Sequence, residues 1–191
     1  MESPCSGQSS EVLKKAENAA VEMYRFAALM LGDEAEAVRL VEDTVASVEI
    51  DPCADPRATK GMVRDRVLDG ALAIMHQQDP VSFGDLPPAE PGAGCIDDDG
   101  APSLSSEQLS ELMAGAGRGP LREWLNRLTQ AQRAVFVQRA VLGRTNADTA
   151  KAINRIAPPA VWSAEAVGRL FRQALCSLAS ALVHSVPATQ S

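Results

Sequence analysis

The chain has 191 residues, 46% of them hydrophobic and 23% charged, which is enough to bury one or two modest cores. Its 13 glycines and 12 prolines exclude a collagen-like or wholly disordered chain, and an aromatic content of 4% argues against a β-sandwich. No apolar run approaches the ~20 residues of a membrane span, and the N-terminus lacks the basic and apolar segments of a secretion signal. We therefore expect an all-α protein in the cytoplasm, without a membrane partner.

The formal net charge of -7 divides unevenly along the chain. Residues 1–100 carry 8 Lys+Arg and 20 Asp+Glu, a net charge of -12, whereas residues 101–191 carry 10 and 5, a net charge of +5. Residues 118–172 hold all 10 of the latter basic residues against 3 acidic ones, a net charge of +7. This asymmetry suggests two modules with different partners, and an acidic whole does not exclude nucleic acid if one basic face meets it.

Apolar residues at helical spacing predict three helices in a first module over residues 10–78. Gly32 is expected to end the first helix and Asp33 to cap the second. The spacing places Val45 of the second helix and Met62 of the third on the buried side. The three expected helices cover residues 10–31, 34–50 and 57–76.

Residues 79–119 are predicted to form a linker, interrupted by one short helix at 104–114. The stretch from Asp79 to Pro120 holds 6 of the 12 prolines and 7 of the 13 glycines, and it includes the acidic run 97–99. A second module follows over residues 120–185, with Thr129 and Asn146 as expected N-caps and Gly143 as a helix stop. Its expected helices cover residues 121–128, 130–142, 146–156 and 163–183.

The last two expected helices have the outline of a helix-turn-helix, in which the second helix enters the major groove of DNA. Trp162 is expected to anchor the turn in the core rather than to stack on bases. The alternative is a basic helical hairpin whose arginines only confer solubility. Residues expected to contact phosphates are Arg144, Lys151 and Arg155, and those expected to reach base edges are Ser163, Glu165, Arg169, Arg172 and Gln173.

No catalytic motif stands out, so we expect no enzyme, no cofactor and no small-molecule substrate. The chain lacks a Gly-rich phosphate loop, GxSxG and HExxH. The four cysteines and two histidines are too far apart in sequence for a metal motif, and we expect reduced thiols and no metal. The carboxylates of residues 33–69 are interpreted as a solvated helix face.

Two segments resemble bacterial RNA polymerase sigma factors of the extracytoplasmic-function type. Residues 125–143 look like the start of region 4, residues 147–153 resemble the first helix of its helix-turn-helix, and residues 167–175 resemble its recognition helix. Residues 24–45 look like region 2, through the Gly-Asp step and the helix that follows it. The resemblance implies binding of promoter -35 DNA by the second module. It also implies that the first module binds core RNA polymerase through Arg39, Leu40, Glu42 and Asp43, with an anti-sigma factor as a further candidate partner.

Departures from the family pattern leave two other interpretations open. Residues 57–75 contain no aromatic residue, although family members use aromatics near here to open the -10 element, and Arg39 stands where an acidic residue is common. One alternative is therefore a sigma-like regulator that binds DNA or polymerase without opening promoters. The other is an interaction module that mimics sigma and binds an anti-sigma factor or polymerase without DNA.

Overall fold

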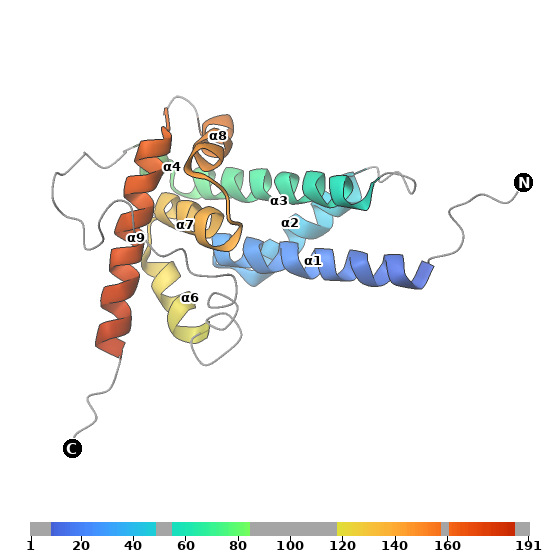
Figure 1. Cartoon of the computed structure of the whole chain (residues 1–191), viewed down its shortest axis with the longest axis horizontal. Helices are drawn as coiled ribbons and strands as arrows, with labels where there is room; N and C mark the ends of the chain where they lie inside the picture. Colours follow the sequence, from blue (N-terminus) through green and yellow to red (C-terminus); the bar gives the residue numbers. More distant parts are fainter. Residues whose placement is uncertain (1–8, 49–54, 85–117, 158–160, 186–191) are drawn as a thin grey trace, which may run out of the picture. The chain divides into compact units, whose positions relative to one another are not determined.

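The computed structural model describes residues 9–48, 55–84, 118–157 and 161–185 (Figure 1). Every regular element in these residues is a helix, which confirms the expectation of an all-α chain. In the same residues, no helix combines the length and the apolar character needed to cross a membrane. The chain divides into two compact units, Met1–Ile74 and Met75–Ser191.

The first unit contains α1 (Ser9–Leu31), α2 (Glu34–Ser47) and most of α3 (Pro56–Gln78) (Figure 1). Gly32 has a φ of +74°, a conformation that glycine adopts at no steric cost and that ends α1. The carboxylate of Asp33 accepts hydrogen bonds from the backbone N–H groups of Ala35 at 2.8 Å and Glu36 at 3.0 Å. The predicted helix stop and N-cap are both confirmed.

Apolar side chains from all three helices form the core of the first unit. Lys60 on α3 pairs with Glu22 on α1 at 2.6 Å, at the exposed edge of the same contact. The expectation that Val45 and Met62 point inward is wrong, because they are 40% and 43% exposed. Each lies beside the buried stripe of its helix rather than within it. The core side chains include Met23, Phe26 and Met30 of α1, Ala37 and Val41 of α2, and Val67, Leu68 and Leu72 of α3.

The second unit begins inside α3 and includes α4 (Pro80–Gly84), a helix in a stretch that the sequence analysis assigned to the linker. Proline is also favoured in the first turn of a helix, and the Asp79 carboxylate accepts a hydrogen bond from the Ser82 N–H at 3.1 Å. Phe83 is only 1% exposed, so burial stabilises this short helix. The linker prediction is also wrong at its end, because Arg118 and Gly119 already belong to the helix expected over 121–128. Residues 85–117, including the predicted helix at 104–114, lie outside the described residues.

The rest of the second unit runs from α6 to α9 (Figure 1). Thr129 and Gln132 form a reciprocal capping box at the start of α7, which confirms the predicted cap. The helix expected over 130–142 changes at Val137 into a π-helical turn, η1, and Gly143 (φ +63°) then ends it. The bounds are α6 (Arg118–Arg127), α7 (Gln130–Phe136), η1 (Val137–Val141), α8 (Asn146–Ile156) and α9 (Ala164–Ser185).

Aromatic side chains join α6, α7 and α9 in the core of this unit. The rings of Trp124 and Phe136 meet edge to face at 4.9 Å, and Phe171 lies 6.1 Å from Phe136. The indole N–H of Trp124 donates to the Ser177 hydroxyl at 3.1 Å. Cys176, also on α9, is disulfide-bonded, so the expectation of reduced thiols is wrong for this residue.

Candidate nucleic-acid interface

α8 and α9 pack through small and apolar side chains, as a helix-turn-helix requires. Ala150 and Ile153 of α8 are buried, as are Val167 and Leu170 of α9. The N-cap of α8 is Thr145 rather than the predicted Asn146: its hydroxyl accepts from the Asp148 N–H at 3.1 Å. The predicted pair of helices is therefore present, with α8 over the predicted residues and its cap one residue earlier than expected.

Gly168 sets how closely the start of α8 approaches α9. A Cβ at this position would lie 3.0 Å from the Asn146 amide nitrogen and 3.7 Å from a guanidinium nitrogen of Arg172. The first contact is tighter than ordinary van der Waals separation. The absence of a side chain at Gly168 thus lets the Asn146 amide settle against α9 beside Arg172.

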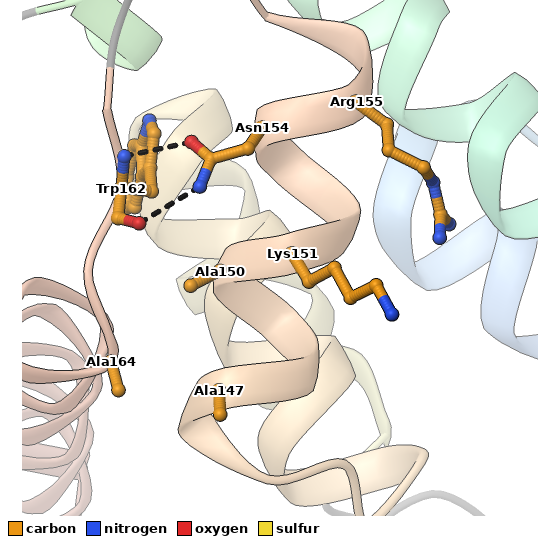
Figure 2. Close-up of a pocket in the computed structure, with 7 residues that line it drawn as sticks. All are labelled: Ala147, Ala150, Lys151, Asn154, Arg155, Trp162 and Ala164. Carbon is orange, nitrogen blue, oxygen red and sulfur yellow. Dashed lines mark hydrogen bonds between the residues drawn. The ribbon is translucent and has the colours of Figure 1, made fainter.

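The segment between the two helices is anchored by Trp162, which is 3% exposed. Its indole N–H donates to the Phe83 carbonyl at 3.0 Å, and its ring lies 6.3 Å from the Phe83 ring. The side-chain amide of Asn154 bonds both backbone groups of Trp162, as Figure 2 shows: its oxygen accepts from the N–H at 2.7 Å and its nitrogen donates to the carbonyl at 2.9 Å. The prediction that Trp162 is a core anchor is confirmed.

An open pocket of about 470 Å³ lies between α8 and the start of α9 (Figure 2). Its apolar surface comes from alanines and Trp162, while Lys151 and Arg155 extend together from α8 away from Trp162. These two residues are four apart, so they share a helix face. The pocket is lined by Ala147, Ala150, Lys151, Asn154, Arg155, Trp162 and Ala164.

Two of the three predicted phosphate contacts, Lys151 and Arg155, are exposed on α8, and the third, Arg144, is half-buried just before that helix. The carbonyl of Arg144 accepts a hydrogen bond from the guanidinium of Arg139, which also lies 5.2 Å from the centre of the Phe171 ring. Arg139 is thereby directed into the unit by a cation–π contact. The three predicted phosphate contacts therefore lie close together in the chain, on α8 and in the segment just before it.

The five predicted base-reading residues lie at the start of α9 and along its first three turns. Ser163 caps the helix, since its hydroxyl accepts from the Ala166 N–H at 3.1 Å. Arg169, 27% exposed, pairs with Glu165 at 2.8 Å, so a base contact by Arg169 requires this exposed pair to open. Gln173 is exposed, and Arg172 is half-buried beside Gly168. The residues share one region of α9, but their exposure differs.

Not all of the positive charge that the sequence places in this module faces solvent. Arg133 is 5% exposed, and its Nε–H donates to the Leu125 carbonyl at 2.9 Å. Burial disfavours the charged form and lowers the pKa of this guanidinium. Arg133 therefore joins α7 to the end of α6 inside the unit, and it contributes nothing to a DNA-binding surface.

The predicted polymerase contacts divide between the surface and the interior of the first unit. Arg39, Glu42 and Asp43 are exposed on α2, whereas Leu40 packs against α3, with its Cδ1 2.6 Å from where a Cβ on Gly70 would lie. The sequence analysis missed Val38 and Val45, each 40% exposed on α2. These valines are seven residues apart with Glu42 between them, and residues at this spacing share one face of a helix. The spacing could therefore have identified this face of α2 from the sequence.

No known family model, curated protein or solved structure matches the chain.

Proposed function

We propose that the protein is sigma-factor-like and acts in bacterial transcription initiation, binding core RNA polymerase through its first unit and promoter -35 DNA through its second. The observation that carries this proposal is the α8–turn–α9 arrangement. Lys151 and Arg155 are exposed on α8, and the polar residues Ser163 and Glu165 are exposed at the start of α9. This is the order of parts that a helix-turn-helix brings to DNA.

In this proposal the two helices divide the work of recognition. Arg169 and Arg172 on α9 suit guanine, whose N7 and O6 accept a bidentate pair, and Gln173 suits adenine. Lys151 and Arg155 on α8 meet phosphates, which fix the register of the protein without reading sequence. Glu165 is 80% exposed, whereas Arg169 is only 27% exposed, so a base contact by Arg169 requires this ion pair to open first.

The exposed face of α2 supports a protein partner for the first unit. Val38 and Val45 place apolar surface on either side of Glu42, with Arg39 and Asp43 beside them. Apolar side chains ringed by charges are typical of protein–protein contacts. The net charge of -12 over residues 1–100 opposes DNA phosphates, which also favours a protein here.

A second candidate is a sigma-mimicking regulator that binds an anti-sigma factor or polymerase and opens no promoter. The absence of aromatics from residues 57–75, most of α3, favours it, since base stacking is a main way to hold unpaired strands. The deciding experiment is capture of purified core polymerase followed by run-off transcription on a genomic promoter library. Capture with promoter-specific transcripts supports the sigma factor, capture without transcripts supports the regulator, and no capture contradicts both polymerase-binding proposals.

The α2 contact is tested by Glu42→Arg. Reversing this exposed charge between two valines should weaken capture of core polymerase about tenfold, because like-charge juxtaposition in an interface is costly. Glu17→Arg makes the same charge change at an exposed position of α1 and is the matched control. Equal affinity of the two variants would remove α2 from the interface.

Base reading by α9 is tested by comparing Arg169→Ala with Arg155→Ala. Loss of Arg169 should weaken binding to a selected duplex by ~1–3 kcal/mol while leaving random DNA unaffected. Loss of Arg155 should weaken binding to both duplexes alike, because phosphates are the same in each. An equal loss on both duplexes for Arg169→Ala would refute its role in reading bases.

A further inference from the structure

Three hydrogen bonds converge on Trp162, only two residues before α9 begins. The next residue, Ser163, caps α9 through the Ala166 N–H. A displacement of Trp162 therefore moves the cap and the first turn of α9 with it. That first turn is where a recognition helix meets base edges.

Asn154 makes an unusual use of its amide for a residue on an exposed helix position. Its oxygen and its nitrogen both bond to the backbone of one residue, at 2.7 Å and 2.9 Å (Figure 2). Two bonds to the same peptide groups fix direction as well as distance, as in a bridge between two strands. Since Asn154 is exposed, core packing does not explain an asparagine at this position.

The third bond ties the turn to α4. The carbonyls in the last turn of a helix have no partner within that helix, and the Phe83 carbonyl accepts from the Trp162 indole at 3.0 Å. Phe83 is 1% exposed and lies between the rings of His76 at 5.7 Å and Trp162 at 6.3 Å. Trp162 is thus held from α8 on one side and from α4 on the other.

We propose that Asn154 and Trp162 are positioning residues that set the direction of α9 against α8, and thereby determine sequence specificity rather than general affinity for DNA. The inference rests on the proposed DNA binding of this unit. Lys151 and Arg155 project from α8 itself, so their phosphate contacts do not depend on where α9 points. Releasing Trp162 should consequently affect cognate DNA and spare random DNA.

The test compares Asn154→Ala with Lys151→Ala on two probes: a duplex selected by the wild-type chain from a randomised pool, and the unselected pool. Asn154→Ala should bind the selected duplex about tenfold more weakly, which is the effect of losing one good base contact. Its affinity for the unselected pool should not change. Lys151→Ala, one turn earlier on α8, should weaken binding to the selected duplex and to the pool by the same factor. Asn154→Asp keeps the acceptor for the Trp162 N–H and should recover part of the loss.

A second measurement needs no DNA, so it separates this inference from the proposed function. Amide hydrogen exchange should show the Trp162 backbone N–H exchanging at least about tenfold faster in Asn154→Ala, because its acceptor is gone. Trp162→Phe should leave that N–H protected while removing the indole bond alone. If the wild-type chain selects no duplex, the proposed function is contradicted. The exchange data still show whether Asn154 holds the Trp162 backbone in place. Unchanged exchange in Asn154→Ala, or equal losses of affinity on both probes, would overturn the positioning role. If Asn154→Ala is unfolded, Trp162→Phe decides on the two probes, because it releases the bond to the Phe83 carbonyl and should weaken binding to the selected duplex alone.

Discussion

The contact between Leu40 and Gly70 shows how one missing side chain determines the fit of two helices. A Cβ on Gly70 would lie 2.6 Å from the Leu40 Cδ1, well inside van der Waals separation. Glycine inside a helix is itself unfavourable by roughly 0.5–1 kcal/mol relative to alanine. The close approach of α2 to α3 thus accounts for a glycine within α3.

Gly70→Ala should change the stability of the first unit by less than about 1 kcal/mol, because displacing the end of the half-buried Leu40 side chain offsets the gain in helix propensity. The two tryptophans of the chain lie in the second unit, so far-UV circular dichroism, rather than tryptophan fluorescence, is the appropriate probe of unfolding.

The same substitution in a Leu40→Ala background should stabilise the first unit. With the Leu40 methyl groups removed, the added Cβ meets open space and alanine gains roughly 0.5–1 kcal/mol over glycine. A double-mutant cycle measures this coupling. Additive effects of the two substitutions would show that the Leu40 side chain does not constrain Gly70.

At the scale of elements, the start of α8 couples helix capping to a titratable group. The Thr145 hydroxyl accepts from the Asp148 N–H and donates to the Asp148 carboxylate at 2.7 Å. This hydrogen bond, with a smaller effect of Arg144 and Lys151, lowers the pKa of Asp148. The charged form also suits the positive end of the helix dipole.

Thr145→Val should raise the pKa of Asp148 towards the ordinary value of about 3.9. In the wild type the folded-state pKa lies below the unfolded one. The contribution of the Asp148 carboxylate to the stability of the folded state is therefore present above about pH 4. It is lost as the pH falls through the folded-state pKa. Carboxyl chemical shifts measured against pH report the change directly. Thr129→Val removes the cap of α7 and should leave the pKa of Asp148 unchanged; an unchanged pKa in Thr145→Val would exclude the hydroxyl as its cause.

The elements that could be predicted from sequence are those whose ends depend on local chemistry. Gly32, Asp33, Thr129 and Gly143 act through their own backbone angles or through atoms three residues away, so the pattern was sufficient. α4 and η1 were missed for a different reason. The burial of Phe83 stabilises α4 through contacts distant in sequence, and prolines and glycines in the neighbouring stretch predicted a linker instead.

At the scale of the whole molecule, charge counts predicted two modules but not the surfaces that the charges occupy. Arg133 is buried against the Leu125 carbonyl, and Arg139 is drawn over the Phe171 ring. Arg127 pairs with Glu123 on the surface of α6. Tertiary contacts distinguish Arg133 and Arg139 from the cations at α8, whereas the Glu123–Arg127 pair is local to one helix. The net charge of +7 over residues 118–172 therefore overstates the charge that DNA would meet.

The salt dependence of DNA binding should measure how many of the 10 basic residues in this module contact phosphates. Each neutralised phosphate contributes about -0.9 to the slope of log K against log salt concentration. Contacts by Arg144, Lys151 and Arg155 alone predict a slope of roughly -3 for the full chain, whereas participation of every cation predicts roughly -9.

Single substitutions then show which basic residues contribute to the slope of log K against log salt concentration. Lys151→Ala and Arg155→Ala should each reduce its magnitude by about 1, on selected and random duplexes alike. Arg127→Ala removes an exposed cation that is paired on α6 and should leave the slope unchanged. A slope near -9 that falls equally for Arg127→Ala would mean that DNA contacts a broad basic surface. This result would contradict the proposal that α8 and α9 form the DNA-binding surface, because specific docking through these two helices leaves α6 outside the contact.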